Sequence, residues 1–446
     1  MCSSDLVQPQ PQSGDPIERF NWDAPILVSP HSPRRLYYAS QRVWRSDDRG
    51  DSWKPVSGDL TRNQDRMLLP LMGRKWSWDS PWDMIAMSTY DTITSLAESP
   101  KAEGLLYAGT DDGLIQVSED GGATWRKIEV GSITGVPAVA FVNDIKADLF
   151  DANTVYAALD DHKSGSFRPY LLKSSDRGRT WRSITGDLPD RHLVWRVVQD
   201  HVKPDLLFAG TEFGIFFTID GGGRWMKLGG DVPTISFRDL AIQRRENDLV
   251  GASFGRGFYV LDDYSALRDI APQTLAESAR LFPLRDAYLF SLLGQAPAGS
   301  AGVGPMAGNW TAPNPPFGAV FTYQVRQDLP ADTKLVLTIT DDSGKQVRRL
   351  ELEKTAGLRR VAWNLRTDPP APGEAGSAGS PQAGAAQGGR AGGPGAAGGF
   401  GGFGRGGQQA PLVPAGRYRA TLGTLVGDKV TAIGPTQTFA VVQIPQ

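Results

Sequence analysis

The chain has 446 residues, with 47 Lys and Arg against 49 Asp and Glu, which gives a formal net charge of −2 at pH 7. This balance argues against a nucleic-acid or anionic-membrane partner, and no apolar run is long enough to predict a transmembrane helix. The single cysteine, Cys2, excludes internal disulfides and thiolate metal sites, and the length favours two or three domains.

Residues 1–19 are polar and rich in Pro and Gln, and they lack the basic and apolar segments of a secretory signal. We expect this segment to be disordered. We also expect that it is not the native start of the protein, because Phe20 already reads as the middle of a repeat array.

One eight-residue pattern, Ser/Thr-x-Asp-x-Gly-x-Thr-Trp, occurs at residues 46–53, 118–125, 174–181 and 218–225, with Ser52 and Arg224 in place of the Thr. This pattern, the Asp-box, predicts a hairpin between the outer strands of a propeller blade. Its Asp accepts hydrogen bonds from turn amides, its Gly supplies a positive φ, and its Trp packs beneath the turn. We therefore interpret the following residues as structural and not catalytic: Asp48, Gly50, Trp53, Asp120, Gly122, Trp125, Asp176, Gly178, Trp181, Asp220, Gly222 and Trp225.

Each box follows two strand-like segments, and a fifth copy of those segments at residues 235–263 lacks the box. The interval from Asp176 to Asp220 is the length of one blade, whereas the earlier intervals carry insertions at residues 61–90 and 160–169. These repeats predict an all-β fold with a β-propeller over residues 20–263. About five blades are visible, fewer than we expect in a closed ring, so we expect an incomplete ring that has lost blades on its N-terminal side.

The remainder of the chain has a different composition. We predict a linker at residues 264–317 with a short helix near 272–280, followed by a small immunoglobulin-like β-sandwich at 318–446. Residues 371–409 are dominated by Gly and Ala, which cannot bury enough surface to offset the entropy of ordering them. We expect a disordered insertion there.

Three further segments point to a family. Residues 109–114 (Gly-Thr-Asp-Asp-Gly-Leu), 210–215 (Gly-Thr-Glu-Phe-Gly-Ile) and 254–257 (Phe-Gly-Arg-Gly), together with the boxes, resemble the bacterial BNR-repeat, sortilin-type propeller proteins. The resemblance covers about residues 20–263, and the C-terminal part resembles the immunoglobulin-like domain at the ends of such proteins. It implies a C-terminal fragment of a secreted or periplasmic parent. Sialidases and two-propeller xyloglucanases share Asp-boxes, so a glycosyl hydrolase label follows the scaffold and not the chemistry.

The insertion at residues 61–90 holds the candidate site residues. Trp76, Trp78 and Trp82 lie beside Asp79 and Asp83, a combination that offers stacking platforms for a sugar and a pair of acids. The alternative is an insertion that buries its Trp side chains over a blade and uses its Asp side chains to cap turns. Other suitable acids in strand-end loops are Asp111, Asp112, Asp160, Asp161 and Glu212. Asp111-Asp112-Gly113 and Glu212-Phe213-Gly214 recur at equivalent blade positions, which favours tight strand-connecting turns for these acids.

The sequence supplies no other catalytic signature. It contains no Arg-Ile-Pro element of a sialidase, and the four His residues show no metal-ligand spacing, so we expect no metal and no cofactor. The favoured hypothesis is a non-catalytic, secreted propeller scaffold that binds a protein, peptide or glycan. The alternative is a glycoside hydrolase of the two-propeller xyloglucanase type, with a cleft completed by a missing N-terminal propeller.

Overall fold

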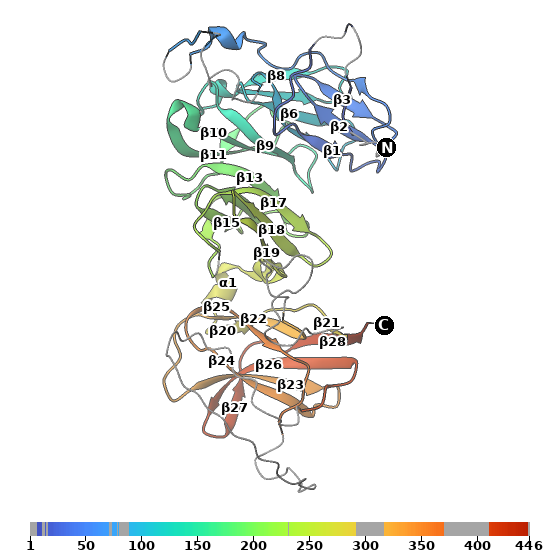
Figure 1. Ribbon diagram of the computed structural model, residues 1–446. Coiled ribbons are helices and arrows are strands. Elements are labelled where there is room, and N and C mark those ends of the chain that lie inside the picture. The colour runs from blue at the N-terminus through green and yellow to red at the C-terminus, as the bar shows by residue number, and fades with distance from the viewer. Residues whose placement is uncertain are drawn as a thin grey trace, which may run out of the picture. The chain divides into compact units, whose positions relative to one another are not determined.

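The computed structural model describes residues 7–10, 14, 17–70, 74–77, 79, 89–230, 232–290, 316–369 and 410–444 (Figure 1). Its elements are almost all short antiparallel strands, which confirms the predicted all-β class. The chain divides into two compact units, Met1–Arg268 and Asp269–Gln446. Each unit is described here by itself.

The described residues of the first unit form five small antiparallel sheets that follow one another along the chain. The first to fourth sheets each have four strands and the fifth has three. Their bounds are β1 Ile26–Val28, β2 Leu36–Ala39, β3 Val43–Ser46, β4 Lys54–Pro55; β5 Ile93–Glu98, β6 Leu106–Thr110, β7 Leu114–Ser118, β8 Arg126–Glu129; β9 Phe141–Ala147, β10 Val155–Asp161, β11 Ser166–Ser174, β12 Arg182–Ser183; β13 Val194–Gln199, β14 Leu207–Thr211, β15 Gly214–Thr218, β16 Met226–Lys227; and β17 Phe237–Gln243, β18 Asp248–Ser253, β19 Gly257–Leu261.

The first strand of each sheet packs on the first strand of the next, β1 on β5, β5 on β9, β9 on β13 and β13 on β17. This arrangement is that of propeller blades around a channel, and it confirms the predicted propeller. Apolar clusters fill the space between neighbouring blades. Between the first two, for example, Tyr37 and Val43 pack with Ile93, Leu96 and Leu106, all of them buried.

The four Asp-box turns share one hydrogen-bond pattern. In the second sheet Ser118 Oγ donates to Asp120 Oδ1 at 2.8 Å, and the Gly122 amide donates to Ser118 Oγ at 2.8 Å. The Thr124 amide then donates to Asp120 Oδ1 at 2.9 Å, which closes the turn. Gly122 has φ +101°, and a Cβ there would lie 2.6 Å from the carbonyl oxygen of Val56, so only glycine fits without strain.

The described residues contain four 3-10 segments, Arg66–Leu68, Val130–Ser132, His162–Ser164 and Ser265–Asp269. The last follows β19 and crosses the boundary between the two units. Among the described residues, no helix has the length and apolar character that a membrane span requires.

The second unit consists of two sheets around one apolar core. The smaller has the order β20 Ala279–Leu281, β22 Ala319–Val325, β25 Gly357–Trp363. The larger contains β21 Ala287–Leu289, β28 Gln437–Gln443, β26 Gly416–Val426, β23 Lys334–Asp341 and β24 Gln346–Leu352, with β27 Lys429–Ala432 beside β26. Both sheets contribute to a core that includes Trp363, Phe321, Leu337, Tyr418 and Phe439.

The segment that the sequence predicted as a linker, residues 264–317, contains structure in its described part. A short helix, α1 Pro272–Ala276, precedes β20 and β21, and these two strands pair with β22 and β28. They join the sheets because Ala279, Leu281 and Ala287 bury apolar side chains in the core. The Gly/Ala-rich insertion predicted at 371–409 lies outside the described residues.

Candidate binding site in the propeller channel

The inner strands of the second to fifth sheets each contain a β-bulge near their start. The pairing register skips one residue in each strand, and the skipped residues are Thr94, Asn143, Trp195 and Arg238. A bulge re-aims the side chain that it leaves outside the ladder. Repetition of the bulge from blade to blade therefore directs four side chains to equivalent places around the channel.

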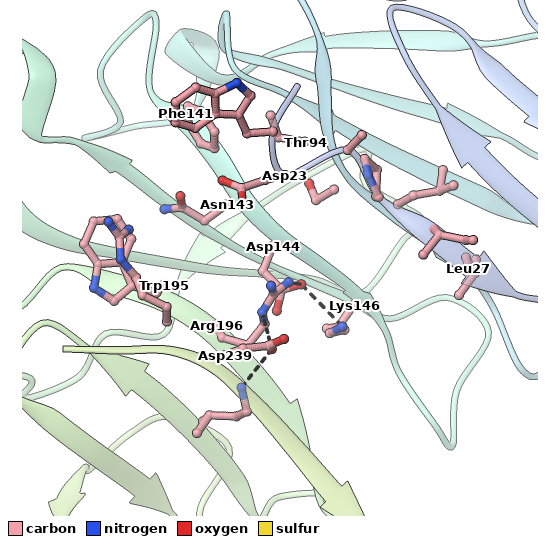
Figure 2. A pocket seen from close by; sticks show the side chains of 18 of the residues that line it. Asp23, Leu27, Thr94, Phe141, Asn143, Asp144, Lys146, Trp195, Arg196 and Asp239 are labelled. Carbon is pink, nitrogen blue, oxygen red and sulfur yellow. Dashed lines mark hydrogen bonds and ion pairs between the residues drawn. The ribbon is translucent and has the colours of Figure 1, made fainter. Parts of the chain in front are cut away.

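All four of these side chains line one cavity of about 870 Å³ in the first unit. The residue that follows each of them, Ser95, Asp144, Arg196 and Asp239, also lines it. The first sheet contributes Ile26 and Leu27, and the segment before it contributes Trp22 and Asp23. We call this cavity the channel pocket; Figure 2 shows several of these side chains converging from different strands.

Aromatic rings gather at one end of the channel pocket, which we call the mouth. The Arg238 guanidinium lies 3.7 Å from the centre of the Trp195 ring and 5.5 Å from that of Phe254. The indole Nε1 of Trp195 donates to Glu212 Oε2 at 3.0 Å, which fixes the orientation of the ring. Phe141, at the start of β9, lies 4.9 Å from Lys163 Nζ. The mouth thus combines stacking surfaces with cations held against them.

The mouth faces away from the Asp-box turns. In an antiparallel blade the chain reverses direction at every strand. The start of the first strand and the loop between the second and third strands therefore lie at one end of the blade. The loop between the third and fourth strands lies at the other end. Phe141 and Trp195 lie at the starts of β9 and β13, whereas the Asp-boxes follow the third strands. The insertion that contains Trp76 precedes β5 and begins on the mouth side.

An ion-paired network lies along the pocket wall. Arg196 Nη1 donates to Asp144 Oδ1 at 3.0 Å, and Arg196 Nε lies 2.8 Å from Asp239 Oδ1 (Figure 2). Lys146 Nζ is 3.5 Å from Asp144, and the Val197 amide donates to the second Asp144 oxygen at 3.0 Å. The Asp144 carboxylate raises the pKa of Arg196, which burial alone would lower. These charges bind one another and join the third, fourth and fifth sheets.

A second polar pair supports the mouth. The Asp160 carboxylate accepts a hydrogen bond from Asn143 Nδ2 at 2.8 Å and pairs with His162 Nδ1. Burial works against the charged form, but the contacts with His162 and Asn143 hold the pKa of Asp160 below its usual range. The His162 ring in turn packs edge-on against Trp195, with ring centres 5.7 Å apart. Asp160 thus positions the ring that contacts Trp195.

The sequence-predicted site residues lie elsewhere, as far as the structure describes them. Trp76 is half-buried beneath the Arg74 guanidinium, 3.5 Å from the ring centre, and Asp79 is exposed and bonded to Ser77. Neither lines the channel pocket. Trp78, Trp82 and Asp83 lie outside the described residues, so the predicted grouping of the three Trp with the two Asp stays a prediction.

The recurring acids have different surroundings. Asp111 accepts hydrogen bonds from the amide and hydroxyl of Thr92, both at 2.8 Å, yet its burial raises its pKa to about 7. Asp112 accepts from the Arg62 amide at 2.6 Å, and burial together with Asp112 raises the pKa of Asp91. The contact between Asp112 and Arg62 connects the second sheet to the insertion before it.

The Asp-box carboxylates are saturated by their own turns. Hydrogen bonds from Ser52 and Ser46 lower the pKa of Asp48 to about 2, and those from Thr124 and Ser118 lower the pKa of Asp120 to about 2. An acid held ionised in this way is a poor proton donor near neutral pH. Among the described residues, no group of three or more His, Cys, Asp or Glu side chains is arranged to hold a metal ion.

Sequence reasoning missed the channel pocket, although a signal was present. The inner strands read Ile-Thr-Ser-Leu, Val-Asn-Asp-Ile, Val-Trp-Arg-Val and Phe-Arg-Asp-Leu, from residues 93, 142, 194 and 237. In each strand a variable, mostly polar pair interrupts apolar residues at the same place in the repeat. Innermost strands line a propeller channel, so this pair marks the channel wall.

No protein-family profile matches the chain. The Dispase autolysis-inducing protein of Streptomyces mobaraensis is 26% identical over 263 residues, which cover 44% of this chain and 68% of that protein. A xyloglucanase of Hypocrea jecorina is 26% identical over 145 residues, covering 29% of this chain and 17% of the enzyme. The chain therefore spans only a small part of that enzyme.

Several solved structures resemble the chain loosely. A GH74 xyloglucanase from Xanthomonas campestris is 21% identical with a TM-score of 0.40, covering 59% of this chain and 40% of that chain. An ancestral GH74 enzyme is 14% identical with a TM-score of 0.39, covering 76% and 39%. The β-propeller domain of Cps50 from Myceliophteria thermophila is 12% identical with a TM-score of 0.39, covering 77% and 90%. Likeness at this level says nothing about ligand or reaction.

Proposed function

We propose that the first unit is a non-catalytic binding module whose ligand enters the mouth of the channel pocket. The ligand is a protein, peptide or glycan segment that stacks on the exposed aromatic rings around Trp195. The second unit acts as a spacer or docking domain. A secreted or periplasmic location of the parent protein belongs to the same proposal and rests on the sequence resemblance.

The repeated bulge is the observation that carries the proposal. It aims Asn143, Trp195 and Arg238 at one cavity from three consecutive blades. Pockets that bind ligands combine apolar and aromatic walls with fixed polar groups. The channel pocket has both, and about half of its lining residues are polar or charged. Trp195 is 4% exposed and is held by Glu212, His162 and Arg238, so its ring is a fixed part of the pocket wall. Trp22 and Phe254, which also line the pocket, are 84% and 71% exposed and offer the open stacking surfaces.

The charges of the pocket favour binding over hydrolysis. A glycosidase needs two carboxylates directed at the scissile bond, one of them able to donate a proton. Asp144 is instead 2% exposed and engaged by Arg196 and the Val197 amide. Asp239 pairs with the same guanidinium, but its side chain is 58% exposed. Asp144 is therefore closed to a substrate, whereas Asp239 is the accessible carboxylate of the network.

The relatives support two kinds of ligand. The Streptomyces mobaraensis relative is named for inducing autolysis of Dispase, which supports a protein ligand. The Hypocrea jecorina relative is a xyloglucanase, which supports a glycan and keeps a glycoside hydrolase as the second candidate. In the hydrolase case the acids would come from Asp23 and Asp239 at the pocket, or from Asp79 and Asp83 in the insertion, with a cleft completed by further blades.

Paired binding and hydrolysis measurements separate the candidates. The protein is applied to peptide and glycan arrays and, in parallel, incubated with a panel of β-glucans. We expect no hydrolysis, and we expect the array to give a ligand whose binding is lost in Trp195→Ala. Binding should be retained in Phe150→Ala, because Phe150 is an exposed ring in the loop between β9 and β10, at the end of the blade opposite the mouth. Release of reducing ends that disappears in Asp239→Asn, or in Asp79→Asn and Asp83→Asn, would overturn the proposal and establish the hydrolase.

A further inference from the structure

One part of the channel pocket is lined by a turn that precedes the first strand, β1. Trp22 and Asp23 occupy the two central positions of this turn, because the Ala24 amide donates to the carbonyl oxygen of Asn21 at 3.2 Å. The Trp22 ring is 84% exposed. Its place at the pocket therefore depends on how the turn is held.

The Asn21 side chain holds the turn. Its Oδ1 accepts a hydrogen bond from the Asp23 amide at 3.1 Å, which fixes the backbone on the far side of Trp22. Its Nδ2 donates to Thr92 Oγ1 at 2.8 Å, directly before β5 of the second sheet. Asn21 is 7% exposed, so its amide is a buried link between the turn and the second sheet.

Asp111 completes this link. Its Oδ2 accepts from Thr92 Oγ1 at 2.8 Å, and its Oδ1 accepts from the Thr92 amide at 2.8 Å. The Thr92 hydroxyl thus donates to Asp111 and accepts from Asn21, which uses its single proton in one direction. Thr92 and Asp111 are 0% and 5% exposed. We call the chain of Asn21, Thr92 and Asp111 the turn anchor.

Other contacts hold the segment before the turn. Arg19 Nε donates to the carbonyl oxygen of Asp91 at 3.0 Å, and Phe20 packs edge-on against Tyr38 with ring centres 5.6 Å apart. These contacts keep the segment on the blades when the turn anchor is broken. Substitution of an anchor residue therefore frees the turn without detaching the segment.

From this geometry we infer that the turn anchor positions the Trp22 ring for ligand binding, so that Asn21 and Thr92 are positioning residues of the channel pocket although neither lines it. The inference rests on the proposed function and adds to it a dependence on buried groups outside the pocket. A ring that is held in place before the ligand arrives loses less conformational freedom on binding.

A nitroxide at position 22 tests the positioning without any ligand. Cys2 is the single cysteine, so Trp22→Cys in a Cys2→Ser background gives one labelling site. The spectral line of the label is expected to narrow when Asn21→Ala or Thr92→Val is added, because the turn gains motion on the nanosecond timescale. Thr92→Ser keeps the hydroxyl and should keep the wild-type line. Thr154→Val is the matched control, because it breaks a comparable bond from a buried Thr to an Asp at the other end of a blade.

Calorimetric titration of the array-selected ligand into the unlabelled proteins tests the consequence. Asn21→Ala and Thr92→Val should each weaken binding by at least about fivefold, whereas Thr92→Ser and Thr154→Val should bind as wild type. Because the anchor acts through the ring, adding Thr92→Val to Trp22→Ala should weaken binding no further. Melting temperatures show that each variant is folded.

The outcomes separate this inference from the proposed function. Unchanged spectra or full affinity in both Asn21→Ala and Thr92→Val would overturn the inference, and the proposed function would stand if Trp195→Ala still loses binding. A further loss of affinity in the double variant with Trp22→Ala would also overturn it, since the anchor would then act by another route. Absence of any array ligand would remove the proposed function and this inference together.

Discussion

The Arg196 guanidinium and the Asp144 carboxylate meet at 3.0 Å and connect the inner strands of the fourth and third sheets. Because Arg196 also faces Asp239, three consecutive blades share one charge network on the wall of the channel pocket, with the buried Asp144 carboxylate in it. The network holds the bulged residues Asn143, Trp195 and Arg238 in register with one another. The same charge network therefore contributes to the stability of the propeller and to the position of the side chains that line the channel pocket.

Asp144→Ala is expected to destabilise the propeller by about 2 kcal/mol, because the Val197 amide loses its acceptor and the Arg196 guanidinium, 26% exposed, keeps only Asp239 as an ion-pair partner among the described residues. Urea unfolding followed by tryptophan fluorescence measures the change. Lys146→Ala is the control: its ammonium lies 3.5 Å from Asp144 and is 43% exposed, so we expect a loss below about 1 kcal/mol. Equal effects of the two substitutions would show that the network does not stabilise the blades.

Gly109→Ala tests the close approach of the second and third sheets. A Cβ at this position would lie 2.3 Å from Val142 Cγ1 and 2.4 Å from Ser95 Oγ. Overpacking of this kind costs about 1–3 kcal/mol, which the same unfolding measurement resolves. Gly58→Ala, whose Cβ meets nothing within 4 Å, is expected to change stability by less than about 0.5 kcal/mol. An unchanged midpoint for Gly109→Ala contradicts this packing.

Asp120→Asn tests the role of the Asp-box. The folded-state pKa of Asp120 is about 2, below its ordinary value of 3.8. Its contribution to stability is therefore complete above about pH 4 and disappears as the pH falls towards 2. Melting temperatures of wild type and variant should differ at pH 7 and converge near pH 2. A difference that is constant with pH would mean that the carboxylate charge is not what the turn requires.

Asp91→Asn tests the buried acids beside the insertion. Burial and the neighbouring Asp112 raise the pKa of Asp91, and burial raises that of Asp111 to about 7, above the ordinary 3.8. The folded state thus binds more protons than the unfolded state, and stability falls as the pH rises from about 4 to about 7. Asp91→Asn removes part of this dependence.

The difference in melting temperature between pH 5 and pH 8 should accordingly be smaller in Asp91→Asn than in wild type. Asp190→Asn, at an exposed position, should behave as wild type. A larger difference in the Asp91 variant would show that the ionised carboxylate stabilises the fold.

The blades were predictable because their information is local. Asp120, Gly122 and Trp125 specify a turn within eight residues, and the strands before it repeat in order. The channel pocket was not predicted from the sequence, because a one-residue bulge decides whether the Trp195 side chain faces the core or the channel. The ladder register that creates the bulge depends on pairing with β14, and β13 alone does not reveal it. Only comparison of the inner strands of several repeats shows the interrupted pair. The same limit applies to Arg196, whose partner Asp144 belongs to another blade.

The clustered Trp and Asp of the insertion remain a prediction, because only Trp76 and Asp79 of that group are described, and these two residues do not line the channel pocket. The channel pocket is instead lined by single positions of several blades. Adjacency in sequence is therefore weak evidence for a site, whereas recurrence at one position of the repeat is stronger.

The location of the binding site is tested most directly by calorimetric titration of an array-selected ligand into wild type, Trp195→Ala and Trp76→Ala. Loss of this ring from the pocket wall should weaken binding by at least about tenfold, or roughly 1.4 kcal/mol, in Trp195→Ala. Trp76→Ala should bind as wild type. Full affinity in Trp195→Ala together with lost affinity in Trp76→Ala would contradict the account and move the site to the insertion.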